Sequence, residues 1–202
     1  MNSRNILIGL VVLFALLGMW TCSKRNQFVS KREEAKAQWQ QVQTQYQRRM
    51  DLIPNIVSTV KAQANFEKKT LEDVINARAK ATQVTINTDN LDEASIEKFK
   101  KAQGELSGAL GRLLAVAENY PELRTNQAFS ELRTELEGTE NRIAVQRMKY
   151  NELVKEYNKS IQFFPGNIVA ALFGFIPLPY VEAEAGSEKA PNVGKQLEDM
   201  MK

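Results

Sequence analysis

Histidine is absent from all 202 residues of this sequence, and cysteine occurs once, as Cys22. The missing histidine removes the commonest general acid or base and the commonest metal ligand, so Cys/His zinc sites and carboxylate–histidine di-iron sites are excluded by count. A single cysteine cannot form an internal disulfide, so the fold must be stable without one. We expect no catalytic residue, no metal site and no cofactor.

The sequence also lacks a strong charge of one sign. Lysine and arginine number 27 against 24 aspartate and glutamate, which gives a formal net charge of +3, and the two signs are interleaved. Nucleic-acid binding needs a concentrated basic surface, so nucleic acid is not an expected partner. A helical body of about 140 residues is long enough to bury a core within one domain.

One long apolar run, ILIGLVVLFALLGMWTC, extends from Ile6 to Cys22 and carries no charge. At 1.5 Å per residue, its about 17 residues span roughly 26 Å, which is the short end of a transmembrane helix. Trp20 fits an interfacial aromatic position, and Lys24 and Arg25 can reach lipid headgroups. Residues 1–23 are therefore predicted to form an N-terminal transmembrane anchor in the cell membrane.

Two other fates of this run are weaker alternatives. A cleaved signal peptide needs small residues in an A-x-A-like pattern, where this sequence has the bulky Leu17, Met19 and Trp20. A lipoprotein signal needs small residues just before its cysteine, whereas Met19, Trp20 and Thr21 precede Cys22. We favour a retained single-pass anchor and leave open whether Cys22 is lipidated.

The basic residues around the run favour a cytoplasmic body. Lys24, Arg25, Lys31 and Arg32 follow the run, whereas Arg4 and the amino group precede it. By the positive-inside rule the richer flank stays in the cytoplasm. The opposite orientation is the alternative.

Residues 24–164 carry apolar residues at alternating steps of three and four, the pattern of amphipathic helices. Pro54, Pro121 and the polar loop Thr82 to Asp92 interrupt the pattern. Four stripes result: Ala35, Trp39, Val42, Tyr46 and Ile53; Val57, Val60, Ala64, Leu71 and Val74; Ile96, Phe99, Gln103, Leu106, Leu110, Leu113, Ala117 and Tyr120; Phe129, Leu132, Leu136, Ile143, Tyr150, Val154, Tyr157, Ile161 and Phe164. We predict an all-α protein, an antiparallel up-and-down four-helix bundle preceded by the transmembrane helix. An extended coiled-coil dimer is the alternative, and the three interruptions argue against it.

Several distinctive motifs follow one another along the chain. They are Tyr46-Gln-Arg48-Arg49-Met-Asp51-Leu52-Ile53-Pro54-Asn55; Glu118-Asn119-Tyr120-Pro121-Glu122-Leu123; Leu136-Glu137-Gly138-Thr139-Glu140-Asn141-Arg142-Ile143; Arg147 with Tyr150-Asn151; Tyr157-Asn158; Phe164-Pro165-Gly166-Asn167; and Gly174-Phe175. In sequence and in order, over roughly residues 5 to 182, they resemble the LemA family, and the first is similar to its RRxDLIPN signature. The resemblance implies a bacterial membrane protein with an N-terminal anchor and a four-helix bundle. One relative takes part in building magnetosome membranes. The resemblance implies a fold and a location, and no reaction.

The first candidate site lies where two turns of the predicted bundle meet. The turn after its first helix and the turn after its third helix share the end remote from the membrane, and they supply Arg48, Arg49 and Asp51 together with Glu118 and Tyr120. Such a cluster could bind a protein partner or a small anionic group through the donor fork of arginine. It could equally cap helix ends and hold one buried ion pair that fixes the register.

A second polar patch lies on the last helix. Thr139 falls on its apolar stripe, and Glu137, Glu140 and Arg142 flank it. Gly138 costs about 1 kcal/mol relative to alanine inside a helix, which suggests close approach of another helix. We expect an internal polar network, with a ligand pocket in the bundle as the alternative.

The third feature is an uncharged segment, Phe163 to Val181. Its central stretch, Ile168 to Ile176, would make about 13 Å of helix, which is too short to span a bilayer. Residues 165–181 are predicted to lie near the membrane, either in contact with it or with a partner, or folded back as a lid over the bundle. The candidate membrane contacts are Phe164, Phe173, Phe175 and Tyr180. The mixed composition of residues 182–202 predicts a disordered tail.

These features predict a membrane-anchored, non-enzymatic scaffold or adaptor in membrane organisation or envelope processes. Its expected partners are the lipid bilayer and a protein that the sequence does not identify, and the oligomeric state is left open. The alternative is a bundle that senses a ligand or binds lipid. An enzyme is disfavoured, because it would need a carboxylate pair as acid and base, and no suitable loop or Gly-rich phosphate motif is visible.

Overall fold

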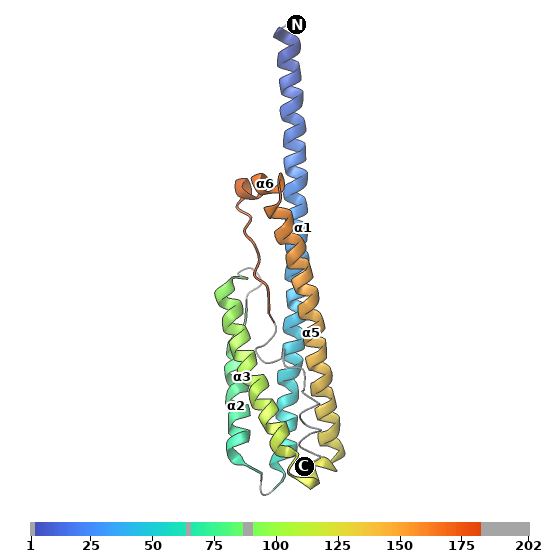
Figure 1. Cartoon of the computed structure of the whole chain (residues 1–202), viewed down its shortest axis with the longest axis vertical. Coiled ribbons are helices and arrows are strands. Elements are labelled where there is room, and N and C mark those ends of the chain that lie inside the picture. The colour runs from blue at the N-terminus through green and yellow to red at the C-terminus, as the bar shows by residue number, and fades with distance from the viewer. Residues whose placement is uncertain (1–2, 64–65, 87–90, 183–202) are drawn as a thin grey trace, which may run out of the picture. The chain divides into compact units, whose positions relative to one another are not determined.

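A computed structural model describes residues 3–63, 66–86 and 91–182 (Figure 1). In these residues the secondary structure is helical, as predicted, and no strand is present. The helices are α1 (Ser3–Lys61), α2 (Lys68–Gln83), α3 (Glu93–Ala117), α4 (Pro121–Arg124), α5 (Gln127–Gln162) and α6 (Gly166–Phe173). The predicted tail, residues 182–202, lies outside the described residues except for Glu182.

The chain divides into two compact units, and α1 and α5 each contribute one part to both. Unit 1 consists of Met1–Thr44, Asn87–Asp92 and Val145–Tyr180. Unit 2 consists of Gln45–Ile86, Glu93–Ala144 and Val181–Lys202.

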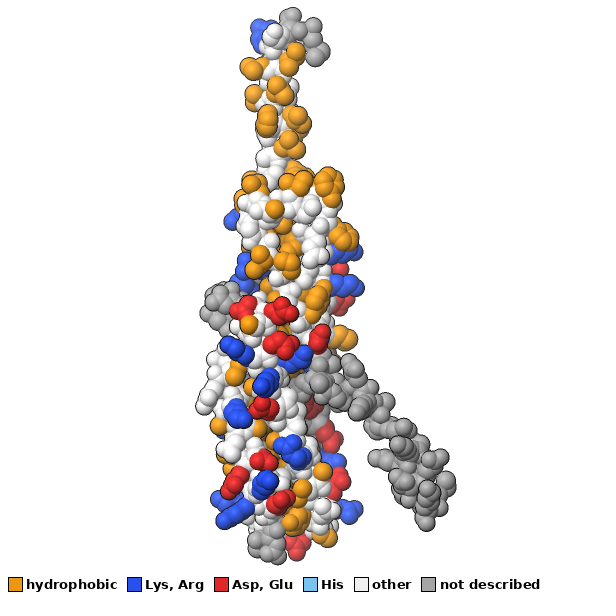
Figure 2. All heavy atoms as spheres, turned by 60° about the vertical axis from the view of Figure 1, so that its left-hand side comes forward, with side chains coloured by type: hydrophobic (Ala, Val, Ile, Leu, Met, Phe, Trp, Pro, Cys, Tyr) orange, Lys and Arg blue, Asp and Glu red, His pale blue; other side chains and the backbone are white. Residues whose placement is uncertain are grey.

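The N-terminal part of α1 is apolar on all sides. Among the described residues, α1 is the one helix long and apolar enough to cross a membrane, with a mean hydropathy of 2.3 in its most apolar window. None of that window is buried against protein, and Leu7, Phe14 and Met19 are 64%, 69% and 71% exposed. Figure 2 shows hydrophobic side chains all along this part of the helix. An amphipathic helix of a soluble core would have one polar face, and this stretch has none.

Unit 1 has a core made by α1, α5 and the chain that follows them. Trp39 of α1 and Tyr150 of α5 are fully buried, with their ring centroids 5.2 Å apart. Phe28, about three helix turns before Trp39, is also buried and meets the ring of Phe175 edge-on at 5.5 Å. Gly166 begins α6 where a Cβ atom would clash with the backbone of α5, so glycine is required there.

Unit 2 is organised around one hydrophobic cluster to which α1, α2, α3, α4 and α5 all contribute. Figure 1 shows α2 and α3 side by side, and they pack directly on each other. The cluster consists of Met50, Leu52, Ile53, Ile56, Val60, Phe66, Leu71, Val74, Ala77, Ala81, Leu106, Ala109, Leu110, Leu113, Ala117, Leu123, Phe129 and Leu136. Many of these residues are the predicted apolar stripes, because helical periodicity places them on one face of each helix.

The predicted helix end at Pro54 is wrong. Pro54 lies inside α1, which continues to Lys61, and α2 begins only at Lys68. Proline has no N–H, so the carbonyl of Met50 one turn earlier loses its helical partner. Arg78 of α2 replaces it, since its Nε donates a hydrogen bond to the Met50 oxygen at 3.0 Å. A side chain from another helix thus satisfies the carbonyl that the proline leaves free.

The other boundaries agree more closely with the sequence pattern. Pro121 opens a new helix, α4, after α3 has ended at Ala117, as its position predicted. The predicted loop, residues 82–92, begins two residues later, after α2 ends at Gln83, and residues 87–90 of it lie outside the description. The short apolar helix covers Gly166–Phe173 rather than 168–176, because Gly174 ends it in a left-handed conformation with φ 69°.

Candidate functional site

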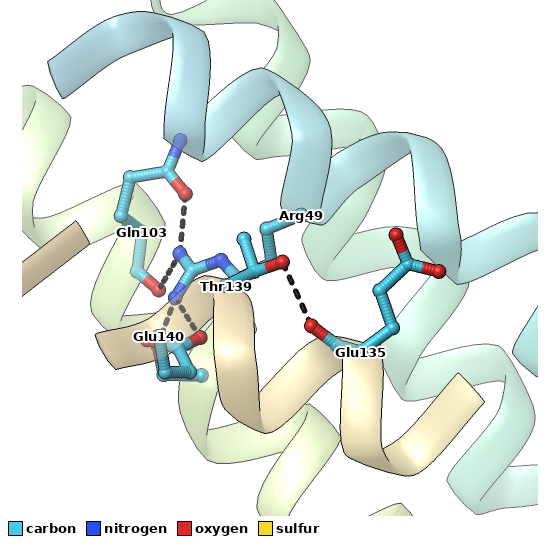
Figure 3. A network of polar contacts seen from close by, with 6 residues as sticks. Arg49, Gln103, Glu135, Thr139 and Glu140 are labelled. Carbon is cyan, nitrogen blue, oxygen red and sulfur yellow. Dashed lines mark hydrogen bonds and ion pairs between the residues drawn. The ribbon is translucent and has the colours of Figure 1, made fainter. Parts of the chain in front are cut away.

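A buried arginine forms the centre of a polar network in unit 2. The side chain of Arg49 is 0% exposed, and its guanidinium group lies between α3 and α5 (Figure 3). Its Nη1 donates to Glu140 Oε1 at 2.6 Å and to Ser107 Oγ at 2.7 Å. Its Nη2 donates to Gln103, to the side-chain oxygen at 2.5 Å and to the backbone oxygen at 3.3 Å. One side chain of α1 therefore joins three helices.

An aromatic ring and a carboxylate stabilise the positive charge of Arg49 in its buried position. The guanidinium carbon lies 5.0 Å from the ring centre of Tyr46, which in turn meets Phe99 edge-on at 5.0 Å. A cation is attracted to the face of an aromatic ring, and the carboxylate of Glu140 supplies the balancing charge. A buried charge without such partners would be strongly destabilising, so the network is what allows Arg49 to lie buried between α3 and α5.

The neighbouring arginine behaves differently. Arg48 pairs with Glu135 at 3.0 Å, and the two side chains are 53% and 41% exposed. Asp51, also exposed, accepts a hydrogen bond from Gln47 at 2.7 Å within α1. An exposed ion pair of this kind contributes little to stability. The two adjacent arginines thus have separate roles, one on the surface and one in the core.

The turn that was expected to present Arg48, Arg49 and Asp51 does not exist, because α1 continues through it. The two expected members from the other turn have their own contacts: Glu118 lies 3.5 Å from Arg133, and the ring of Tyr120 lies 5.0 Å from that of Phe66. The structure instead joins Arg49 to Glu140, which the sequence had assigned to the second patch. An interaction role for the five residues stays a prediction.

The second patch is an internal chain of hydrogen bonds on α5. Thr139 is fully buried, and its hydroxyl donates to the backbone oxygen of Glu135 at 2.8 Å and accepts from Arg142 at 3.3 Å. Glu137 points outward and pairs with Arg133 at 3.0 Å. The expected approach of another helix to Gly138 is not seen, since a Cβ atom there would meet only the Arg142 side chain, at 3.7 Å. Gly138 leaves room for this arginine.

In unit 1, residues 174–180, here called the strap, run back along α5 after α6 has ended. Asn158 of α5 makes two hydrogen bonds of 2.8 Å with the backbone of Leu178, one as donor and one as acceptor. Tyr150 donates to the Pro179 oxygen at 3.0 Å, and Tyr157 donates to the Ile176 oxygen at 2.9 Å. Burial raises the pKa of both tyrosine hydroxyls, which therefore keep their protons and remain donors.

The four predicted membrane contacts differ in exposure. Phe164, Phe173 and Tyr180 are 79%, 43% and 49% exposed, whereas Phe175 is partly buried against Phe28. Three of the side chains are therefore available for contact outside the protein, and Phe175 is directed into it. Their contact with a membrane stays a prediction.

Some of the residues that matter were not chosen from the sequence. Gln103 had been noted only as a polar member of an apolar stripe, and Ser107 and Asn158 had been given no role. A buried polar residue on an apolar stripe is the signal that could have identified Gln103 as a partner of Arg49. In the described residues, no group of three or more histidine, cysteine, aspartate or glutamate side chains is placed to hold a metal ion.

These observations define an all-helical protein with one apolar N-terminal helix and a buried arginine network. The sequence model of the LemA family matches residues 38–194. The chain belongs to the LemA family.

Two groups of curated relatives agree with this assignment. The chain is 26% identical to Magnetosome protein MamQ 2 of Paramagnetospirillum magneticum over 191 residues, which are 85% of this chain and 69% of that protein. It is 26% identical to Magnetosome protein MamQ of Magnetospirillum gryphiswaldense over 196 residues, with 87% and 71% covered. It is 23% identical to Protein LemA of Metamycoplasma hominis over 147 residues, with 73% and 64% covered.

Proposed function

We propose that this chain is a membrane-anchored, non-enzymatic scaffold or adaptor in membrane organisation or envelope processes. Its α1 acts as a retained single-pass anchor, its body faces the cytoplasm, and unit 2 is an up-and-down four-helix bundle that presents surfaces to a protein partner. The names of the MamQ relatives, which are magnetosome proteins, support a role at a membrane.

The observation that carries this proposal is the continuity of α1. The apolar stretch and the residues that build the unit 1 core, including Phe28 and Trp39, belong to one uninterrupted helix of 59 residues. A signal sequence that is removed needs a cleavage site after its apolar part. Here the residues after Cys22 are helical, and Phe28 is already buried six positions later. This favours retention of the apolar helix with the body.

The composition of the unit 2 core supports the bundle. Four long helical segments, from α1, α2, α3 and α5, share one hydrophobic cluster, and Arg49 links three of them through defined hydrogen bonds. A bundle held in one register offers a rigid outer surface, which is what a scaffold requires. The exposed Arg48–Glu135 pair is a part of that surface.

Extraction and protease accessibility test the anchor and its orientation. The full chain is expected to stay in the membrane pellet after alkaline extraction and to be protected from protease in spheroplasts. Release into the alkaline supernatant would contradict the anchor. Digestion in intact spheroplasts would place the body on the outer side.

Site-specific photo-crosslinking tests the scaffold role. A crosslinker placed at Arg48 in the full chain should capture the same protein repeatedly, and one placed at the buried Thr139 should not. A chain reduced to residues 1–30 and fused to an unrelated protein controls for contacts made by the anchor alone. If the full chain and the anchor fusion capture the same proteins, the scaffold role is refuted.

A ligand-sensing or lipid-binding bundle is the alternative. It required a polar cavity around Thr139, and that hydroxyl is instead engaged with the Glu135 backbone and Arg142. Soaking small anionic and aromatic ligands while following the NMR signals of Thr139 and Arg142 distinguishes the two functions. Saturable chemical-shift changes confined to these residues would favour the ligand-sensing function.

A further inference from the structure

A groove in unit 1 combines basic and aromatic side chains. It has a volume of about 270 Å³ and lies between α1 and the junction of α5 with α6. Its basic residues are Lys24, Lys31 and Lys159, and its single acidic residue is Glu156. Because three cations face one carboxylate, the groove is positively charged.

The existing contacts leave two of these cations available to a ligand. Lys31 is engaged by Glu156, at 3.5 Å from its carboxylate and 3.4 Å from its backbone oxygen. Lys24 meets the neutral side chain of Gln27 at 3.2 Å, and Lys159 lies over the ring of Phe163 at 5.6 Å. Neither contact supplies a negative charge, so an anion in the groove would gain ion pairs with Lys24 and Lys159.

The side chains beside the groove are apolar and exposed. Phe164 is 79% exposed, and Ile168 and Leu172 on the outer face of α6 are 60% and 71% exposed. The helix from Gly166 to Phe173 carries no charged residue. The lysines beside this short helix come from α1 and α5, and together they place exposed apolar side chains next to basic ones, as at a membrane interface.

The position of α6 along α1 agrees with this. Figure 1 shows α6 next to α1. The C-terminal residue of α6, Phe173, stacks under Arg25 at 5.6 Å, and Phe175 meets Phe28 at 5.5 Å. Arg25 and Phe28 follow the end of the apolar run at Cys22 by three and six residues, or about 5 to 9 Å of helix. The headgroup layer on each side of a bilayer is roughly 5 to 8 Å deep. If the apolar run spans the membrane, the Lys24 end of the groove and the C-terminal end of α6 therefore lie in that layer or at its outer edge.

We propose that this groove binds the headgroup of an anionic phospholipid, with Lys24 and Lys159 holding the phosphate and the exposed side chains of α6 inserted beside its acyl chains. The inference rests on the proposed anchoring, which brings the groove to the headgroups. A single membrane span would thereby gain a second, lipid-selective contact.

Lipid titration of the full chain tests the headgroup site. The chain is purified in detergent, stripped of lipid and titrated with phosphatidylglycerol or phosphatidylcholine, with bound lipid counted by native mass spectrometry. Wild type should prefer phosphatidylglycerol. The double substitution Lys24→Gln/Lys159→Gln should weaken phosphatidylglycerol binding on the order of thirtyfold, since each basic side chain near an anionic surface contributes about fivefold. Phosphatidylcholine carries the same phosphate next to a cationic choline group, so its binding should weaken much less.

Matched variants make the outcome specific. Lys149→Gln/Lys155→Gln removes the same charge from exposed positions of α5 outside the groove and should keep the preference. Lys24→Arg/Lys159→Arg should keep it too. Equal binding of the two lipids by wild type, or an equal loss in both glutamine variants, overturns the proposal. Displacement of the lipid by inorganic phosphate at a similar concentration would assign the groove to free phosphate and also overturn it.

A depth measurement tests the α6 contact separately from the anchor. A nitroxide at Leu172→Cys in a Cys22→Ser chain, reconstituted in phosphatidylglycerol vesicles, should be more accessible to oxygen than to a water-soluble nickel complex. A nitroxide at Lys155→Cys should show the reverse. Equal behaviour of the two sites overturns the proposal. A failed anchor is distinguishable, because the chain would then leave the vesicles on alkaline extraction.

Discussion

Replacing Arg49 by methionine should destabilise unit 2 far more than the same change at its neighbour Arg48. Methionine keeps much of the side-chain volume but removes the hydrogen bonds to Gln103, Ser107 and Glu140. Removing one partner of a buried ion pair costs about 3 to 5 kcal/mol. The Glu140 side chain is 40% exposed and can regain water, so we expect the lower end, about 3 kcal/mol.

The control is built into the sequence. Arg48 is the adjacent residue and also pairs with a glutamate of α5, but both side chains of that pair are largely exposed. Arg48→Met should therefore cost less than about 1 kcal/mol. Urea unfolding of the full chain in mild detergent, followed by far-UV circular dichroism, measures both changes.

A double-mutant cycle separates the ion pair from the loss of packing. The coupling energy between Arg49→Met and Glu140→Gln should be about 2 kcal/mol, and that between Arg48→Met and Glu135→Gln should be close to zero. Equal destabilisation by the two arginine substitutions, or a coupling at Arg49 no larger than at Arg48, would refute the reasoning that burial decides the contribution of each pair.

Three further predictions follow from single contacts. Arg78→Met should cost about 1 to 3 kcal/mol in urea unfolding, and most of that loss should vanish in a Pro54→Ala chain, whose new N–H takes over the free carbonyl; an unchanged loss would contradict the role of Arg78. Burial raises the folded-state pKa of Tyr150 above its unfolded value near 10. The free energy of unfolding should therefore keep the full contribution of Tyr150 below about pH 10 and fall as the pH rises further, and Tyr150→Phe should make that fall less steep. Asn158→Ala should speed amide hydrogen exchange at Leu178 by roughly tenfold or more, because both of its hydrogen bonds to the strap are lost; unchanged exchange would show that the strap is held by other contacts.

Helical periodicity predicted much of the fold, since burial along α3 and α5 follows it at most positions. An exception is Phe164, which was placed at the end of the last stripe but lies beyond α5 and is 79% exposed. The same spacing puts Arg49, three residues after Tyr46, in line with the first apolar stripe, and the structure buries it completely. The prediction failed at Pro54, because the rule that proline ends a helix is local. The group that makes the proline acceptable is Arg78, 28 residues away and on another helix. No pattern within one helix contains that information.

The candidate sites were harder to predict, because they depend on which helices meet. Arg49 and Glu140 had both been chosen as site residues, but they had been assigned to different sites, and the structure joins them in one ion pair. The strap illustrates the same limit. Its apolar, proline-containing sequence was compatible with a lid, a partner contact or a membrane contact, and the bonds from Asn158 and Tyr157 to its backbone become visible only in three dimensions.

The unbroken helix from Ser3 through Thr44 has a mechanical consequence for an anchored protein. A flexible joint after the apolar run would let the body turn independently of the bilayer, whereas α1 passes directly into the unit 1 core. From Cys22 to Thr44 the helix is about 33 Å long, so a change in tilt of about 10° moves its far end by about 6 Å. The thickness of the surrounding lipid influences the tilt of a spanning helix. In an anchored chain, a change in that thickness would therefore displace Thr44.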